Sequence, residues 1–225
     1  MMKKAAMLFL ILIFSAGLLS AKISLTLDVG PLFTHFVNSY DDGSARHRIS
    51  ANLGGVNALL QCTFAKNFGV YGMTNFAFGN AYWAHRSTRR SYSGYLHELG
   101  LVYAIDSQYG FFYSFKPQKN LAVMLGFGFG LGGNGFKRVW GNQKQNVHCT
   151  NIGGGINVDV SYMFTKMIGI YGGISDTLYA PVSVSVKDTN KEKSTTYSGS
   201  EIQSGAGVGK ISNSFSLKTG IQITF

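Results

Sequence analysis

The chain has 225 residues, of which 29 are glycine, 14% are aromatic and only 13% are charged, and its formal net charge is +10. A soluble domain usually carries about 25% charged residues, so this composition argues against a globule whose whole surface faces water. Beyond residue 21 no apolar run is long enough for a membrane-spanning helix. A closed barrel is the remaining way to cross a membrane, because only there does every strand backbone group find a partner within the bilayer.

The start of the chain has the layout of a secretory signal peptide. Lys3 and Lys4 precede an apolar run over residues 5–19, and small residues follow it up to Ala21. The run is short for a membrane anchor, and Lys22 stands where a lipoprotein would have cysteine. We therefore expect a signal peptide at residues 1–21 and one exported domain at residues 22–225.

The exported part alternates apolar residues with small or polar ones, in segments of the length that outer-membrane strands use. The last segment is the most regular: residues 215–225 are apolar or threonine at odd positions and small, polar or charged at even ones. A helix would need apolar residues three and four apart, and that spacing is absent. The alternating segments cover residues 23–30, 49–64, 68–78, 98–115, 121–132, 151–164, 168–175 and 215–225.

Two of these segments are irregular. The apolar positions change parity between Leu53 and Val56, and the glycine pair Gly54–Gly55 between them predicts a β-bulge that switches the two faces. Residues 98–115 form either one unusually long strand or a strand interrupted by a wide turn near residues 106–110.

Short and long links alternate between the segments. Short links are expected at 65–67, 116–120 and 165–167, and long polar links at 37–48, 81–94, 134–148 and 187–213. Such alternation is typical of periplasmic turns and extracellular loops. We therefore predict an all-β fold, a closed antiparallel up-and-down transmembrane β-barrel of about eight strands with both ends in the periplasm.

The two faces of the strands have different compositions. The apolar face carries almost no charge, as expected for a wall in lipid, where one charge at the midplane costs about 2–4 kcal/mol. A soluble β-sandwich would show the same alternation with its apolar face inward, but glycine on the polar face and the few charges favour the barrel. The charges on the polar face are expected to face the lumen, as a paired network or a pore lining: Asp28, Glu98, Asp159 and Lys218.

The end of the chain carries a family resemblance. Its last six residues, Gly220 to Phe225, resemble the terminal signal of bacterial outer-membrane barrels, which ends in an aromatic residue after alternating apolar positions. With the signal peptide and the strand pattern, the chain resembles the small OmpX/OmpW/OmpA-like barrel group. The resemblance implies a place in the outer membrane of a double-membraned bacterium, with membrane lipid as a partner and Phe225 read by the barrel-assembly machinery.

Glycines on the inward face give the first functional hypothesis. Three neighbouring strands present Gly126, Gly128, Gly130, Gly132, Gly153, Gly155, Gly169 and Gly173 to the lumen. An eight-stranded barrel is normally just filled by its own side chains, so these glycines could leave a narrow, porin-like conduit or binding cavity for small, hydrophobic molecules, as in OmpW-like barrels. In the alternative, larger side chains fill the space: Tyr71, Met73, Met124, Met163 and Tyr171.

Positive charge in the long links gives the second functional hypothesis. The expected cationic rim consists of Arg86, Arg89, Arg90, Lys137, Arg138 and Lys144. Such a rim suits anionic lipid headgroups or host polyanions, in a structural or adhesive surface barrel without transport. Nucleic acid is not expected as a partner in this compartment, despite the net charge.

The sequence does not predict an enzyme. Its histidines are scattered, and only His85 lies close to a serine, Ser87, in a polar loop without an acid to orient it. No spacing typical of metal ligands is present, so we expect neither a metal nor another cofactor. The two cysteines, Cys62 and Cys149, are expected to be unpaired.

Overall fold

The structure is a computed structural model that describes residues 23–41, 46–79, 82–87, 92–95, 102–140, 143–189 and 194–225. The predicted signal peptide lies outside these ranges. Within them, the chain forms strands and one short helix, α2 (Glu201–Ser204). No helix in the described ranges is long and apolar enough to span a membrane.

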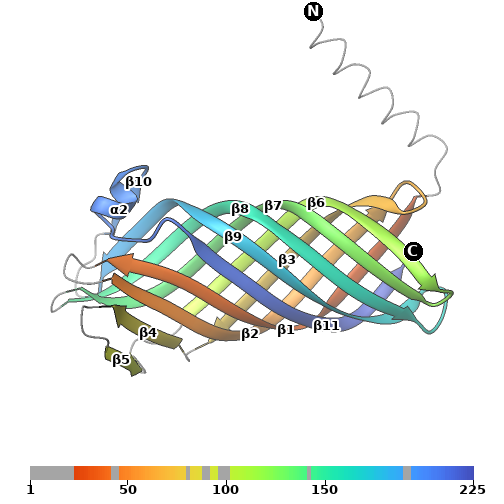
Figure 1. The fold of residues 1–225 in the computed structure, drawn as a ribbon, viewed down its shortest axis with the longest axis horizontal. Coiled ribbons are helices and arrows are strands. Elements are labelled where there is room, and N and C mark those ends of the chain that lie inside the picture. Colours follow the sequence, from red (N-terminus) through yellow and green to blue (C-terminus); the bar gives the residue numbers. More distant parts are fainter. Residues whose placement is uncertain are drawn as a thin grey trace, which may run out of the picture.

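Eight long strands form a closed antiparallel ring (Figure 1). In ring order they are β1 (Ser24–Asp41), β2 (Arg46–Thr63), β3 (Phe68–Gly79), β6 (Val102–Gln118), β7 (Leu121–Trp140), β8 (Gln143–Met163), β9 (Ile168–Asp188) and β11 (Ser212–Thr224). Because β1 pairs with both β2 and β11, no ring strand is left with an open edge along its full length. The predicted up-and-down barrel of eight strands is confirmed.

The two ends of the barrel differ, as the alternation of links predicted. One end, the short-turn end, carries the tight connections at 64–67, 119–120 and 164–167 together with Thr224, where the last strand ends. The other end, the long-loop end, carries the remaining elements, which extend the wall beyond the ring (Figure 1). These are β4 (Tyr82–Ser87) paired with β2, β5 (Tyr92–Tyr95) paired with β4, β10 (Ser194–Ser198) paired with β9, and α2.

The β-bulge predicted at Gly54–Gly55 is wrong. β2 pairs with β1 in one unbroken register from one end to the other. Ile49 and Leu53 therefore keep the parity of Leu59, and all three side chains point into the barrel, where each is at most 1% exposed. The parity change in the sequence arises because the lumen itself is apolar at this height, while the strand does not switch faces.

A β-bulge that the sequence did not reveal lies in β9. Thr150 of β8 pairs with Ser183, whereas its neighbour Asn151 pairs with Pro181, so that one extra residue is inserted in β9. Before the bulge Tyr179 points inward, and after it Val184 and Val186 take the inward positions. The bulge thus switches which residues of β9 fill the lumen.

Two other sequence interpretations are resolved. β6 is a single strand from Val102 to Gln118, so the stretch at 106–110 is one long strand without a wide turn. The link predicted at 134–148 is wrong, since β7 continues to Trp140 and β8 begins at Gln143. Most of that link is a β-hairpin that extends the barrel wall. Pairing of its two strands provides hydrogen-bond partners for the backbone N–H and C=O groups beyond the membrane as well as within it.

The outer wall is apolar along the middle of the strands. On β7, Phe127 is 67% exposed and Phe129 is 50% exposed. All seven remaining strands of the ring also carry exposed apolar side chains. Burying such side chains against lipid removes them from water, and the closed ring leaves the backbone satisfied. The outward face is therefore the lipid-facing one, as the sequence predicted.

Candidate functional site

The barrel interior is the candidate site, and it contains three successive layers. An apolar layer fills the half near the long-loop end, a polar layer crosses the middle, and a cavity opens at the short-turn end. We call them the apolar plug, the polar girdle and the vestibule.

The apolar plug consists of buried side chains from the ring strands, from α2 and from the segment after α2. Its members are Leu32, Phe36, Tyr40, Ile49, Ala51, Leu53, Ala77, Val102, Ala104, Phe136, Val147, Cys149, Val184, Val186, Ile202, Ala206 and Val208. Phe36 and Phe136 are both 2% exposed. An interior packed with such side chains has few voids larger than a water molecule, so the plug excludes water from this half of the lumen.

Residues 199–211, which we call the cap, close the plug from the long-loop end. The Gly207 carbonyl accepts a hydrogen bond of 2.6 Å from the Asp41 amide, and the Gly209 amide donates one of 2.7 Å to the Ser39 carbonyl. Gly207 has a φ of +64°, which favours glycine at this turn. The backbone of β1 therefore holds the cap over the lumen.

Arg138 anchors the cap from the opposite wall. Its Nη1 donates a hydrogen bond of 2.6 Å to the Ala206 carbonyl, and its guanidinium lies 5.5 Å from the centre of the Tyr40 ring. Its Nε donates a further hydrogen bond of 3.0 Å to the side chain of Gln145. The prediction that Arg138 belongs to the cationic rim is wrong: it points inward from β7 and is 2% exposed.

The other five residues of the predicted rim do not lie together in one described segment. Lys137 and Lys144 lie on β7 and β8, and Lys144 is exposed. Arg86 belongs to β4, of which only the backbone is described, and Arg89 and Arg90 lie outside the described residues.

The polar girdle centres on an ion pair. Lys218 Nζ lies 2.8 Å from Asp159 Oδ1, with both side chains buried. The side chain of Asn157 donates a hydrogen bond of 2.5 Å to Asp159, and Gln61 donates one of 2.7 Å to Asp28. Three of the predicted lumen charges thus lie in one buried layer, whereas Glu98 lies outside the described residues.

Asp106 is a lumen charge that the sequence analysis missed. It is 1% exposed and accepts hydrogen bonds from the hydroxyls of Tyr179 and Thr177. Gln108 links this group to the rest of the girdle: it donates to Thr177 at 2.5 Å and accepts from the Tyr71 hydroxyl at 3.0 Å. The even parity of Asp106 was visible in the sequence, but the turn considered at 106–110 concealed it.

Most of the predicted lumen glycines lie against side chains of other residues, whereas Gly128 and Gly153 lie against the backbone of a neighbouring strand. A Cβ added to Gly126 would lie 2.9 Å from the Tyr71 ring, and one added to Gly132 would lie 2.8 Å from the Tyr179 ring. At Gly173 it would overlap the Asp159 carboxylate. At these positions glycine makes room for a large side chain that crosses the lumen, which is the alternative that the sequence left open.

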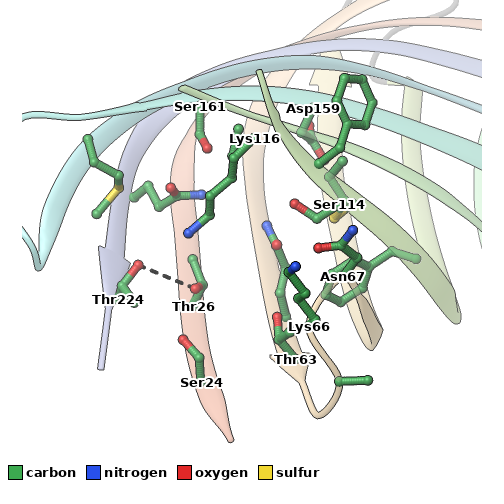
Figure 2. A pocket seen from close by; sticks show the side chains of 18 of the residues that line it. Ser24, Thr26, Thr63, Lys66, Asn67, Ser114, Lys116, Asp159, Ser161 and Thr224 are labelled. Carbon is green, nitrogen blue, oxygen red and sulfur yellow. Dashed lines mark hydrogen bonds between the residues drawn. The ribbon is translucent and has the colours of Figure 1, made fainter. Parts of the chain in front are cut away.

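The vestibule is a cavity of about 820 Å³ at the short-turn end (Figure 2). Nine of its 19 lining residues carry hydroxyls or amides: Ser24, Thr26, Gln61, Thr63, Asn67, Ser114, Ser161, Gln222 and Thr224. Lys66 and Lys116 also line it, and Asp159 of the girdle is among its lining residues. Of the predicted filling residues, Met163 and Met124 contribute apolar wall here.

The described residues include no group of three or more His, Cys, Asp and Glu side chains that could hold a metal ion. Cys62 and Cys149 are both unpaired, and Cys149 is buried in the plug. His35 and His148 are hydrogen-bonded to neighbouring side chains, His148 to the Tyr103 hydroxyl at 3.0 Å.

A closed ring of eight antiparallel strands, with an apolar outer wall and a polar girdle inside, defines a transmembrane β-barrel of the bacterial outer-membrane type. The chain belongs to the family described as domain of unknown function DUF2715, whose profile matches residues 18–225. No curated protein sequence matches the chain.

Solved structures of outer-membrane proteins share this fold. The outer membrane protein OprG from Pseudomonas aeruginosa is 8% identical with a TM-score of 0.58, over 91% of this chain and 97% of that one. A major outer membrane protein from Thermus thermophilus is 12% identical with a TM-score of 0.55, over 87% and 100%. The outer membrane protein AlkL is 12% identical with a TM-score of 0.54, over 90% of each chain. At such identities the likeness concerns the fold alone.

Proposed function

We propose that this protein is exported by means of the segment 1–21 and resides in the bacterial outer membrane. It acts there as a surface scaffold whose lumen is sealed, without a permanently open channel. The observation that carries the proposal is the apolar plug with its cap. Phe36 of β1 and Phe136 of β7 meet Ile202 and Val208 of the cap in one buried cluster. A scaffold of this kind presents a rigid wall outside the cell, with its short turns in the periplasm.

Transport would require a large rearrangement of this interior. Fully burying one phenylalanine side chain is worth about 1.5–3 kcal/mol, and a solute would have to separate several such side chains at once. Below the plug it would meet the ion pair of Lys218 and Asp159, whose partners are costly to separate in a dry interior. Both layers support the scaffold over the conduit for small hydrophobic molecules that the sequence suggested.

The extracellular wall offers a surface for an anionic partner. Lys137 pairs across the strands with Asn146, which pairs in turn with Lys187 of β9. Lys144 lies two residues along β8 from Asn146, and alternation along the strands puts all three lysines on the outward face. A cluster of like charge on a rigid wall attracts polyanions, which supports the adhesive function.

Conductance tests the seal. The folded chain in planar bilayers is expected to show no discrete openings beyond those of the bare bilayer. A variant that lacks residues 201–208 and carries Phe36→Ser and Phe136→Ser is expected to conduct, which also shows that the assay detects an open barrel. Discrete openings of the unaltered chain would overturn the sealed scaffold.

Polyanion binding tests the surface. Heparin is the probe, and the triple variant Lys137→Gln, Lys144→Gln, Lys187→Gln is expected to weaken its binding by about tenfold at low salt. The matched control removes the same charge at the other end, by Lys116→Gln, Lys119→Gln and Lys166→Gln. Equal losses in the two variants would mean that net charge, and not the extracellular wall, binds the polyanion.

A further inference from the structure

Lysine recurs at the short-turn end of the barrel. The turns at 64–67 and 164–167, and the end of β6 with the turn that follows it at 116–120, carry Lys66, Lys116, Lys119 and Lys166. These segments contain no aspartate or glutamate. The predicted cationic rim consists of residues in the long links, so none of these four lysines belongs to it.

Two of these four lysines belong to the vestibule. Lys66 and Lys116 line the cavity, whereas Lys119 and Lys166 do not. In Figure 2 Lys116 reaches into the cavity, with Lys66 on the turn beside the strand that carries Thr63. Two positively charged side chains, Lys66 and Lys116, therefore line the vestibule near its opening.

The charges around the cavity leave these two lysines without a carboxylate partner. Asp159 is the acid among the lining residues, and Lys218 neutralises it at 2.8 Å. Asp28 lies deeper and accepts a hydrogen bond from Gln61. Within the described part of the chain, neither Lys66 nor Lys116 forms an ion pair.

The lining also suits a polar ligand. Hydroxyls of Ser24, Thr26, Ser114 and Ser161 can donate or accept hydrogen bonds, and the Asn67 amide can do both. The volume of about 820 Å³ falls within the range of about 300–1,000 Å³ of small-molecule sites. A ligand cannot pass further without separating the girdle, so the cavity is a blind site.

We propose that the vestibule binds a small anionic molecule from the periplasm, one that bears carboxylate or phosphate groups. Lys66 and Lys116 hold its charged groups, and the hydroxyl and amide lining binds the remainder. The site is open at the short-turn end and closed at the girdle, so it captures its ligand without transporting it. Binding in the vestibule requires the short-turn end to face the periplasm, but it depends neither on the sealed plug nor on the extracellular wall.

Reporter labelling measures the charge of the site. In a Cys62→Ser background, Ser114→Cys places a thiol on the vestibule wall, and the barrel is reconstituted in nanodiscs of neutral lipid. An anionic methanethiosulfonate reagent is expected to react about tenfold faster than a cationic one of similar size. Lys66→Gln with Lys116→Gln is expected to abolish the preference, whereas the control pair Lys119→Gln with Lys166→Gln retains most of it.

Protection of the same thiol then measures binding. Millimolar citrate and millimolar pyrophosphate are the two probes, and slower labelling in the presence of either one supports the site. Protection by citrate alone identifies a carboxylate ligand, and protection by pyrophosphate alone identifies a phosphate ligand. Faster reaction of the cationic reagent, equal effects of the two lysine pairs, or no protection by either anion would overturn the proposal. Heat-modifiable migration on gels shows that each variant is folded.

Discussion

Lys218 of β11 and Asp159 of β8 form a buried ion pair across a strand that lies between them, with Nζ 2.8 Å from Oδ1. The pair thus ties together three adjacent strands, β8, β9 and β11, from inside the lumen. The Asn157 amide and the Met73 sulfur complete its surroundings, at 2.5 Å from the carboxylate and 3.3 Å from the ammonium. Because both side chains are buried, each charge would lower the stability of the barrel if its partner were removed.

The first prediction concerns this ion pair. Lys218→Met is expected to lower the free energy of unfolding by about 3–5 kcal/mol, because it leaves the Asp159 carboxylate buried without its cation. The double variant Lys218→Met, Asp159→Asn removes both charges and is expected to recover most of that loss. Urea unfolding in lipid vesicles measures both values. A single variant as stable as the unaltered chain would contradict the pair's role in the girdle.

The second prediction concerns the cap. Arg138→Ala removes the hydrogen bond to the Ala206 carbonyl and the contact with the Tyr40 ring, so the cap is expected to open more often. Cys149, buried in the plug, reports this opening, since only an exposed thiolate reacts. In a Cys62→Ser background, labelling of Cys149 is expected to be about tenfold faster, which corresponds to about 1.4 kcal/mol of opening free energy.

The neighbouring lysine supplies the control for that experiment. Lys137→Ala removes the same formal charge from the adjacent position on β7, but from the outward face. Its labelling rate is expected to match that of the unaltered chain. If both variants label equally fast, the buried guanidinium does not hold the cap.

The lipid-facing wall could be predicted from the sequence because a bilayer tolerates little variation there. Residues such as Phe127 and Ile221 stand at every second position, and a charge among them would be costly. The lumen is less predictable, because its filling can be apolar or polar. Where it is apolar, at Ile49 and Leu53, the outward positions between them hold Ser50 and Asn52, so the apolar and polar faces of β2 are exchanged and the pattern imitates a change of face.

The contact between Arg138 and the cap could not be predicted from the sequence, for a different reason. A cation beside a second cation, Lys137, in an expected loop is typical of a solvated surface, and nothing local to the sequence reveals that Ala206 brings a carbonyl to Arg138. The bulge of β9 lies in the run from Pro181 to Val186, where valine and serine alternate without a break. Only the pairing with β8 reveals the inserted residue.

The third prediction concerns the inward glycines. Gly126→Ala and Gly132→Ala each place a methyl group less than 3 Å from a tyrosine ring, and each is expected to lower the free energy of unfolding by about 1–3 kcal/mol through overpacking. Gly154→Ala is the control, because its Cβ would come no closer than 3.7 Å to other atoms. Urea unfolding compares the three variants. Equal stabilities would mean that the rings of Tyr71 and Tyr179 do not occupy the space above the glycines.

The fourth prediction tests which face meets the lipid. Phe127 is 67% exposed near the middle of the apolar wall of β7, so Phe127→Arg is expected to cost about 2–4 kcal/mol in lipid vesicles. Thr150→Arg places the same side chain on the outward face of β8 beyond that wall, and there a cost of at most about 1 kcal/mol is expected. A soluble barrel would tolerate arginine at both positions, since both are exposed. Unfolding free energies that fall by the same small amount in the two variants would therefore contradict a membrane around Phe127.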